Sequence, residues 1–473
     1  MELPGLTISK IHDSLVKKEY SALELTKKYL EQIAERDVAI SAFLSASPES
    51  AISQAKETDK LIFAGKKIPM LAGVPCAIKD NILVKGLKCT AGSKILESYE
   101  APYDATVVKK LKKEGAVLLG KTNLDEFGMG ASTENSGFKM TRNPEDLDRV
   151  PGGSSGGSAA AIKASECCFA LGSDTGGSIR QPASFCGVVG LKPTYGAVSR
   201  YGLISFASSL DQVGVLASTV ADAKMIFDVI SGKDSMDSTS IELPKLSNPN
   251  FSIKNLRIGV PKEYFVKGLD KEVEKTVRSA IKKMEAEGAK IEEISLPNTE
   301  YALATYYIIA PSEASANLAR YDGIKYGLSE KEDKLLDVYL KSRGKGFGAE
   351  VKRRIMIGTY CLSSGYYDAY YKKAQQIRNL LREDFKKAFG KVDMIFTPVA
   401  PTTAFKIGEK TADPLSMYLS DIYTVSVSLA GLPAISVPCG RANNLPVGLQ
   451  IIGKHFEEHK ILQTASFIEK LVI

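Results

Sequence analysis

Glycine and serine gather in two clusters between residues 150 and 190. All seven residues from Gly152 to Ser158 are glycine or serine, and a second cluster, GSDTGGS, runs from Gly172 to Ser178. Glycine favours tight turns because it adopts positive φ angles at no steric cost. It also lets backbone N–H groups converge on one point, where they stabilise a developing oxyanion. The clusters therefore indicate either embedded turns or a site that stabilises an oxyanion.

The chain contains only three histidines, His12, His455 and His459, all of them close to the chain ends. Any hydrolytic mechanism with a histidine base has to use one of these three. This scarcity makes a histidine-based hydrolase an awkward interpretation of the glycine and serine clusters.

Two motif matches point to hydrolase or zinc chemistry, and their context argues against both. G-x-S-x-G occurs twice, centred on Ser154 and Ser155, but a stretch made of glycine and serine is expected to match this pattern by chance. The nucleophile elbow also needs a downstream histidine, and only the charged patch KHFEEHK supplies one. That patch spells H-x-x-E-H, with His455 and His459 one helical turn apart. The favoured interpretation is a solvated first turn of a C-terminal helix, and no metal site is expected.

A third match is GAVLLGKT at residues 115–122, which fits the P-loop pattern. A P-loop needs a strand, a flexible glycine-rich loop and then a helix that begins at the Lys-Ser/Thr pair. Residues 116–119 are an apolar run typical of the strand itself, which argues against ATP binding here.

From about residue 70, short apolar runs alternate with amphipathic stretches. GVPCAIKD and AVLLGKT predict strands, and DATVVKKLKKEG between them predicts a helix closed by Gly115. LRIGV, DMIFTPVAP, PAISVPC and GLQIIG predict further buried strands, and DKEVEKTVRSAIKKMEAEG predicts a helix that ends at Gly288. Nearer the start, Ser21 and Glu24 form a capping box for another helix. The alternation predicts a layered α/β fold.

Two segments differ from this pattern. Residues 233–255 are rich in Ser, Asp, Pro and Asn and predict a surface connection. Residues 300–390 look wholly helical and hold 11 of the 20 tyrosines. Tyrosine with lysine on helices is compatible with an RNA surface, but helices that pack their tyrosines on a core are the favoured interpretation.

Composition sets further bounds on the class of protein. A net charge of +7 over 473 residues is mild and is no evidence for a nucleic-acid partner. No apolar run reaches the roughly 18 residues that a membrane span needs, and the start of the chain lacks a signal-peptide pattern. The seven cysteines form no CxxC pair, which suits buried thiols in a reducing cytoplasm.

Five segments, taken in order, resemble the amidase signature family. They are GVPCAIKDN around Lys79, GGSSGGS at 152–158, GSDTGGSIRQPA at 172–183, GLKPTYG at 190–196 and LPVGLQIIGK at 445–454. The resemblance implies an α/β/α layered sandwich around a large mixed β-sheet, with a helical insertion. It also implies a single domain over residues 1–473, with the catalytic segments at 70–220 and a helical substrate or partner region at 300–390.

The resemblance implies a catalytic triad in which Ser178 is the nucleophile, Ser154 the bridge and Lys79 the base. In that family the bridging serine has a cis peptide bond. A lysine is a base only when neutral, so its pKa must fall from about 10.4 to near 7. The end of an apolar strand is a plausible place for such desolvation. The backbone N–H groups of Thr175, Gly176, Gly177 and Ser178 match the oxyanion hole.

Within that family, other segments resemble the glutaminase subunits of tRNA-dependent amidotransferases. They include FGMGASTENSGF, SEASANLARYDGIKYG, VKRRIMIGTYCLSSGYYDAYYKKAQ and DPLSMYLSDIYTVSVSLAGLPAISVP. The substrate implied is glutamine, with Arg354 on its α-carboxylate and Asp421 on its α-ammonium group. Tyr306 is a further substrate-binding candidate, with the adjacent Tyr307 as its alternative. For Arg354 the alternative is a surface ion pair, and for Asp174 and Arg180 we expect a mutual ion pair.

The same resemblance implies a cytoplasmic heterotrimer with two other subunits, B and C, in which this chain supplies ammonia to a partner subunit. There Glu-tRNA(Gln) becomes Gln-tRNA(Gln), and ATP and magnesium belong to the partner rather than to this chain. No cofactor is expected here. Two alternatives stay open: a free-standing amidase that acts on other small amides, and a non-enzymatic scaffold or RNA-binding subunit with a relict site.

Overall fold

One mixed sheet of 11 strands runs through residues 2–244 and 251–472, which are the residues that this computed structural model describes. The strand order is β1-β3-β2-β4-β6-β5-β10-β11-β9-β7-β8. The strands are β1 Phe43–Ala46, β2 Pro75–Lys79, β3 Val117–Thr122, β4 Phe169–Asp174, β5 Val189–Lys192, β6 Gln212–Ala217, β7 Arg257–Pro261, β8 Lys290–Ile294, β9 Met394–Pro398, β10 Ala434–Ala442 and β11 Leu445–Ile452. β2 is parallel to both β3 and β4, whereas β4, β6, β5, β10, β11 and β9 pair antiparallel.

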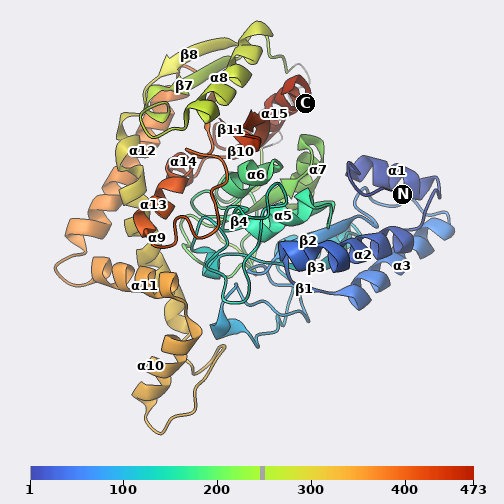
Figure 1. Cartoon of the computed structure of the whole chain (residues 1–473), viewed down its shortest axis with the longest axis horizontal. Helices are drawn as coiled ribbons and strands as arrows, with labels where there is room; N and C mark the ends of the chain where they lie inside the picture. Colours follow the sequence, from blue (N-terminus) through green and yellow to red (C-terminus); the bar gives the residue numbers. More distant parts are fainter. Residues whose placement is uncertain (1, 245–250, 473) are drawn as a thin grey trace.

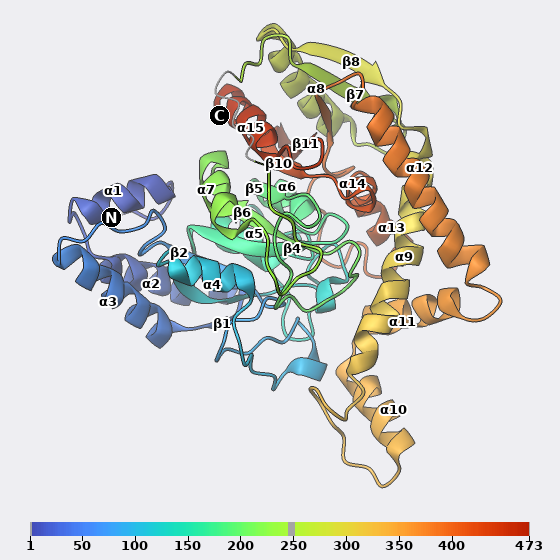
Figure 2. The same cartoon turned by 180° about the vertical axis from the view of Figure 1, so that it is seen from behind.

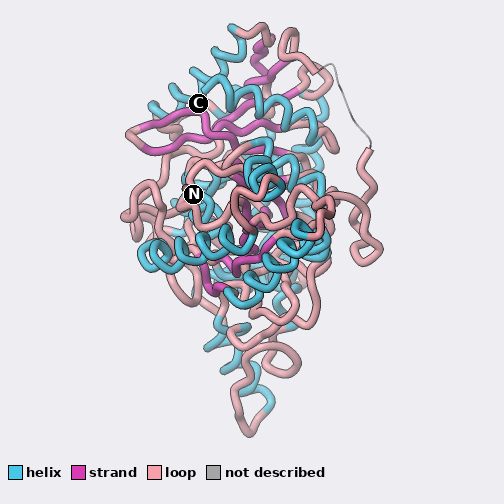
Figure 3. Tube along the Cα trace, turned by 90° about the vertical axis from the view of Figure 1, so that its right-hand side faces the viewer, coloured by secondary structure: helices cyan, strands magenta, loops and turns pink. Residues whose placement is uncertain are grey.

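Helices surround this sheet, and Figure 3 shows the strands running through the middle of the molecule. α5 and α6 pack against the central strands, and α7, α8 and α15 also contact the sheet. The helices are α1 Ile8–Val16, α2 Ala22–Ile40, α3 Pro48–Phe63, α4 Thr106–Lys113, α5 Gly156–Lys163, α6 Arg180–Cys186, α7 Val220–Ile230, α8 Lys271–Ala286, α9 Ala302–Asn317, α10 Leu335–Gly346, α11 Ala349–Leu362, α12 Lys373–Ala388, α13 Pro414–Tyr418, α14 Val425–Ala430 and α15 Glu458–Val472. The α/β fold class predicted from the alternation of apolar runs is therefore confirmed.

The local predictions hold where capping and periodicity were clear. Ser21 caps α2, since its hydroxyl accepts a hydrogen bond from the Glu24 N–H at 3.0 Å and its N–H donates to the Glu24 carboxylate at 2.8 Å. β2, α4 and β3 follow one another as expected, and α8 ends two residues before Gly288. Every residue of β2, β3 and β4 is buried, which explains why these strands show apolar runs rather than alternation.

Helices α9 to α12 lie along one side of the molecule, and α10 projects at its far end (Figure 1). Figure 2 shows the same arrangement from behind. The prediction of wholly helical structure over 300–390 is wrong for residues 321–334, which contain only bends and irregular loop. Gly327 lies in this stretch at φ +75°, and a side chain there would collide with the Ile95 carbonyl. This close approach of two backbones stops a helix from continuing.

The tyrosines of this region divide into two groups. Tyr306 and Tyr321 are buried in a second apolar cluster that joins the helices to the loops around Phe127 and Phe206. Six others are each more than a third exposed: Tyr301, Tyr326, Tyr360, Tyr366, Tyr367 and Tyr370. The prediction that these tyrosines pack on a core is therefore wrong for those six.

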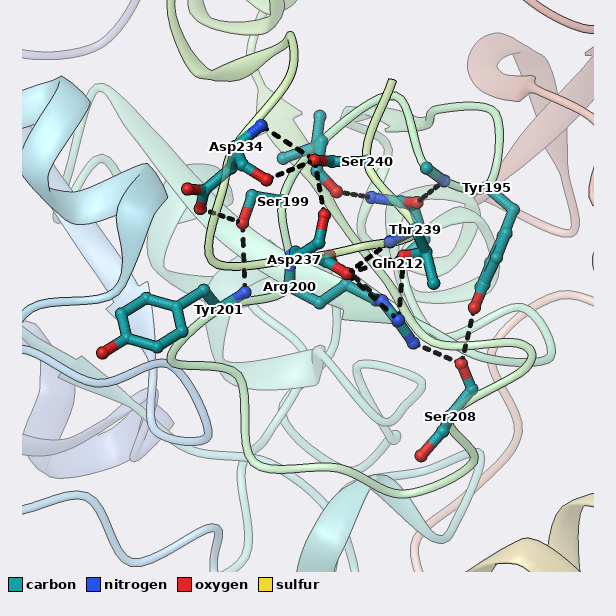
Figure 4. A network of polar contacts seen from close by, with 12 residues as sticks. Tyr195, Ser199, Arg200, Tyr201, Ser208, Gln212, Asp234, Asp237, Thr239 and Ser240 are labelled. Carbon is teal, nitrogen blue, oxygen red and sulfur yellow. Dashed lines mark hydrogen bonds and ion pairs between the residues drawn. The ribbon is translucent and has the colours of Figure 1, made fainter.

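The predicted connection at 233–255 includes residues 245–250, which lie outside the described residues. Its first part is tied to the body of the protein rather than freely solvated (Figure 4). Asp237 accepts a hydrogen bond from the Arg200 N–H at 2.8 Å, and Asp234 accepts one from the Ser199 hydroxyl at 2.6 Å. In the part of the chain that the structure describes, no helix is long and apolar enough to cross a membrane.

The residues of the P-loop match occupy β3 rather than a loop. Lys121 is fully buried, and its Nζ lies 2.8 Å from the Asp80 carboxylate, itself only 2% exposed. Thr90 also donates to Asp80 through its N–H at 2.9 Å. The lysine is therefore half of a buried ion pair, and the expectation that this motif is not an ATP site is supported by its geometry.

The buried pair gives a test of stability. Asp80→Ala leaves the Lys121 ammonium buried without its partner, so we expect a loss of about 3–5 kcal/mol in the free energy of unfolding. Urea unfolding followed by fluorescence measures this loss. Glu272→Ala is the control, because its partner Lys275 is 76% exposed and such a pair contributes about 0–1 kcal/mol. Equal unfolding midpoints for the two variants would contradict the prediction.

Candidate active site

Lys79 ends β2 with its ammonium group buried among hydroxyl groups. Its Nζ lies 2.7 Å from Ser154 Oγ, 2.8 Å from Ser155 Oγ and 3.0 Å from Ser173 Oγ. The Ser173 carbonyl is 3.3 Å away, and the Lys79 side chain is 0% exposed. The strand places the lysine, and both glycine and serine clusters supply its neighbours.

Burial lowers the pKa of Lys79 to about 7, although Asp125, Asp174 and Asp211 oppose the shift through their negative charge. A substantial fraction of the amine is therefore neutral near neutral pH, where it can accept a proton from a serine hydroxyl. The desolvation expected at the end of an apolar strand is what the structure shows.

The first cluster wraps around the lysine before α5 begins. The peptide bond between Gly153 and Ser154 is cis, as the family resemblance implies. The Gly153 N–H donates to the Gln181 side chain at 2.9 Å, which links this cluster to α6. A side chain at Gly153 would collide with the Asp125 carboxylate, so the close packing requires glycine there.

The second cluster carries Ser178 directly before α6. Ser178 is 7% exposed, and its carbonyl accepts a hydrogen bond from the Ser155 N–H at 3.0 Å. The two clusters are therefore joined through their backbones. The Ser178 hydroxyl makes no hydrogen bond with another described residue, so a direct link from Ser178 to Ser154 stays a prediction.

The backbone from Thr175 to Ser178 forms a loop whose four N–H groups donate to no other described residue. Tyr306 and Thr424 press against this loop so closely that a side chain at Gly176 or Gly177 would collide with them. The four N–H groups are available to a substrate oxygen, as an oxyanion hole requires.

Three contacts fix this loop in place. Thr424 donates to the Gly176 carbonyl at 2.6 Å, and Thr175 donates to the Asp211 carboxylate at 2.6 Å. The expected pair of Asp174 and Arg180 is confirmed, with two hydrogen bonds of 2.9 and 3.0 Å between fully buried side chains. Burial alone would raise the pKa of Asp174, but Arg180 holds it below its ordinary value. The ion pair therefore stays charged and braces both ends of the loop.

Arg354 on α11 is buried rather than on the surface, which rules out the surface ion pair as its role. Its Nε donates to Glu350 at 2.7 Å, whereas Nη1 and Nη2 donate to no described residue. The guanidinium lies 5.1 Å from the Tyr307 ring centroid and 5.3 Å from that of Tyr418. Two aromatic faces and one carboxylate orient the guanidinium while its outer edge stays available to a ligand.

Asp421 is 7% exposed, and its carboxylate makes no hydrogen bond with another described residue. Burial raises its pKa to about 8, although the Arg354 charge opposes the shift. Tyr306 packs against Gly176 of the oxyanion loop, whereas Tyr307 stacks on Tyr418 at 3.9 Å between ring centroids. Of the two adjacent tyrosines, Tyr306 is therefore the one that faces the oxyanion loop.

Sequence reasoning missed three residues around this site. Ser155 and Ser173 both contact the Lys79 amine, and their place inside the two clusters was the available indication. Asp211 accepts from Thr175 and also from the Phe206 and Ala207 N–H groups, at 2.8 and 3.0 Å. No local pattern marks Asp211, because its partners come from separate segments.

The three residues of the H-x-x-E-H motif each contact a different part of the protein. His455 Nε2 lies 3.2 Å from the Ala430 carbonyl, and Glu458 accepts from the Thr194 N–H at 2.8 Å. His459 lies 3.8 Å from Asp228. Glu458 is buried, so the predicted solvated turn is wrong for that residue. Among the described residues, no three His, Cys, Asp or Glu side chains are placed to share a metal ion.

The model of one protein family, described as Amidase, matches residues 24–462 of this chain. The chain is 58% identical to the A-subunit of the glutamyl-tRNA(Gln) amidotransferase from Thermoanaerobacter pseudethanolicus, over 99% of this chain and 97% of that protein. The crystal structure of the A-subunit of the glutamyl-tRNA(Gln) amidotransferase from Thermotoga maritima has a TM-score of 0.82 at 45% identity, covering 99% of this chain and 95% of that one. The native peptide amidase from Stenotrophomonas maltophilia has a TM-score of 0.82 at 27% identity, covering 100% of this chain and 98% of that one.

The lowered pKa of Lys79 predicts how Ser178 reacts with a fluorophosphonate. The labelling rate should fall about tenfold per pH unit below 7 and level off above it, because only the neutral amine acts as a base. Mass spectrometry locates the label, and samples quenched at successive times give the labelling rate. Lys79→Met should slow labelling about 10²–10⁴-fold at all these pH values, with a thermal melt to show that the variant is folded.

The control for this measurement is the double variant His455→Asn, His459→Asn, which should label at the normal rate. Loss of labelling in that variant, or a rate independent of pH across neutrality, would show that Lys79 is not the base.

Proposed function

This chain belongs to the amidase family, and on that premise we propose that it is the glutaminase subunit of a tRNA-dependent amidotransferase. The observation that carries the proposal is the pair of Arg354 and Asp421 beside the oxyanion loop. Glutamine offers an α-carboxylate and an α-ammonium group, and these two buried side chains have the complementary charges. A general amidase has no need for such a pair.

The reaction begins when Ser178 Oγ attacks the side-chain amide carbon of glutamine. Its proton passes to Ser154, whose own proton moves to the neutral Lys79 amine. The tetrahedral oxygen takes negative charge opposite the N–H groups of Thr175 to Ser178, and one such donor contributes about 3 kcal/mol. Lys79 returns the proton through Ser154 to the leaving nitrogen, so that ammonia departs. Water then attacks the acyl-enzyme and releases glutamate.

Asp421 gives the binding of glutamine a pH dependence. Its raised pKa, about 8, means that the carboxyl is largely protonated near neutral pH in the free protein. Binding the α-ammonium group favours the carboxylate, so a proton must leave as substrate enters. Affinity for glutamine should therefore fall as the pH is lowered below 8.

Arg354 supports the α-carboxylate because its two outer nitrogens form a planar fork. The guanidinium lies 5.1 Å and 5.3 Å from the Tyr307 and Tyr418 ring centroids and Arg354 is 3% exposed, and this low exposure strengthens its attraction to an anion. Tyr306 packs against Gly176 of the loop, and its hydroxyl makes no hydrogen bond with a described residue. In this proposal it donates to the substrate.

The curated relative is a subunit by name, and we place this chain in the same kind of cytoplasmic assembly. Two partner subunits, B and C, would take up the ammonia and convert Glu-tRNA(Gln) to Gln-tRNA(Gln). ATP and magnesium belong to the partner in this scheme, and the triad itself needs no cofactor. Support for partners comes from exposed apolar side chains on the helical region, which typically mark protein interfaces. They are Ile324, Leu335, Leu336, Leu340 and Met356.

Replacing Arg354 tests the substrate. Arg354→Gln should lower kcat/KM for glutamine by an amount equal to a loss of about 2–5 kcal/mol in transition-state stabilisation, because it removes one half of a buried charge pair with the substrate. Steady-state ammonia release measures the loss. Arg353→Gln is the matched control, since that neighbour is 41% exposed and also contacts Glu350, and its effect should stay within about threefold.

An aryl amide without an α-carboxylate separates the two enzyme hypotheses. Arg354→Gln should hydrolyse it at the wild-type rate if the arginine serves only the glutamine carboxylate. Equal glutaminase activity in the Arg354 and Arg353 variants would instead favour a free-standing amidase that acts on other small amides.

Purification from native cells tests the assembly. The chain should co-purify with two other subunits, and ammonia release should increase when ATP and misacylated tRNA are added to that complex. A chain that purifies alone and shows unchanged glutaminase activity on these additions would overturn the partner proposal while leaving the active site intact.

A further inference from the structure

A cavity of about 680 Å³ lies beside α14, bordered by α12 and by Lys454 and His455. The apolar part of its lining includes Phe385, Phe389 and Leu432. This volume and this lining are typical of sites for small organic molecules. The catalytic triad residues are not among those that line it, so the cavity is separate from the site described above.

The polar groups around this cavity are mainly cations. Arg378, Arg382, Lys386 and Lys454 all line it, and Glu383 is the one carboxylate among the described lining residues. Glu383 lies 3.7 Å from Lys386, which leaves the two arginines without an acidic partner at ion-pair distance among the described residues. Four cations against one carboxylate leave this lining with a net excess of three positive charges, which favours an anion.

The two arginines lie one helical turn apart on α12 and differ in how they are held. Arg378 is buried, and it donates to the Leu429 carbonyl, the Ser209 hydroxyl and the Ser209 carbonyl, each at 2.8 Å. Burial lowers the pKa of Arg378 to about 10, and the charge of Arg382 adds to this effect. Arg382 makes one long contact of 3.3 Å, to Asn379. Arg382 is therefore the cation that is available to a ligand.

Tyr195, which also lines the cavity, is held by several contacts. Tyr195 is fixed through its hydroxyl, which donates to the Ser208 carbonyl at 2.8 Å, and the Arg200 guanidinium lies 5.0 Å from its ring centroid. Figure 4 shows Tyr195 and Arg200 directed at the same residue, Ser208. The Tyr195 N–H also donates to the Gly431 carbonyl at 3.1 Å. An aromatic ring is therefore held in place within the cavity lining.

α14 connects this cavity to the oxyanion loop. At the cavity end, Arg378 binds the Leu429 carbonyl and His455 lies 3.2 Å from the Ala430 carbonyl. At the other end, Thr424 donates to the Gly176 carbonyl at 2.6 Å, directly before α14 begins. The six residues of α14 span only about 9 Å, so we expect a displacement of its cavity end to move its other end, next to Thr424 and the oxyanion loop.

We propose that this cavity binds a small organic anion with an apolar body, and that its occupancy changes the rate of amide hydrolysis at Ser178 through α14. The anionic group lies against Arg382 and Lys386, and the apolar body lies against Phe385, Phe389 and Tyr195. The binding site stands on its own geometry, whereas the effect on rate rests on the proposed function.

Fluorescence titration tests the site with anilinonaphthalene sulfonate, an aryl anion of suitable size, on the full-length protein. The neutral analogue phenylnaphthylamine has the same rings without the sulfonate. We expect saturable binding of the anion at one site and at least about tenfold weaker binding of the neutral compound. Equal affinities for the two compounds would overturn the proposal.

Substitutions then locate the site. The double variant Arg382→Gln, Lys386→Gln should weaken binding of the sulfonate about tenfold or more. The matched control, Lys373→Gln with Lys387→Gln, removes two exposed charges from the same helix outside the cavity and should bind normally. An unchanged Kd in the cavity variant, or an equal loss in the control, would also overturn the site.

Ammonia release from glutamine tests the link to the active site. The ratio of rates with and without saturating sulfonate should differ from one in the wild type and in the control variant. In the cavity variant the ratio should return to one at the same probe concentration. Binding at the cavity without any change in rate overturns the link, and absence of glutaminase activity overturns the proposed function, while the fluorescence result decides the site in either case.

Discussion

The buried ammonium group of Lys79 is the constraint on which the rest of the site depends. A lysine at the end of a fully buried strand loses its hydration. In place of water, only hydroxyl and carbonyl groups of the protein lie at hydrogen-bond distance from its amine. The charged form is therefore penalised, and the amine becomes a base near neutral pH. A histidine base is unnecessary once this has happened. The two glycine and serine clusters follow from the same constraint, because only small residues allow so many polar groups to surround one nitrogen.

The oxyanion loop is held by groups that a substrate never touches. The buried pair of Asp174 and Arg180 closes the loop across its base. Arg180 also donates a hydrogen bond to the Gln450 side chain on β11 at 2.7 Å. Asp211 connects Thr175 to the N–H of Phe206, whose ring lies 5.7 Å from the Arg354 guanidinium. The N–H groups proposed to stabilise the transition state and the arginine proposed to recognise the substrate are thus connected through the same buried contacts, which hold them in fixed positions.

The helical region carries Arg354, which we propose recognises the substrate. It is attached to the sheet domain through its own cluster of buried apolar residues, which includes Tyr306, Val351 and Val425. That attachment brings Arg354 on α11 next to segments that precede it by more than 140 residues. Its outer edge is different, because many large apolar side chains there remain exposed. One face of the region completes the active site, and the other is suited to contacts with other molecules.

The sequence by itself determined the α/β class, most strands and helices and the improbability of a histidine base. These depend on local periodicity, capping and composition, which a chain carries regardless of its tertiary contacts. The ordered segments that resemble the amidase signature family were also visible in the sequence, but their catalytic roles came from that resemblance. The sequence misjudged residues 321–334, six exposed tyrosines and Glu458, because burial depends on which distant backbone passes nearby. Only the tertiary structure placed Ser155, Ser173 and Asp211 around the lysine and the loop. It also showed that Tyr306 rather than Tyr307 faces Gly176. Both outcomes follow from contacts between segments far apart in the chain, whose desolvation and geometry no local pattern encodes.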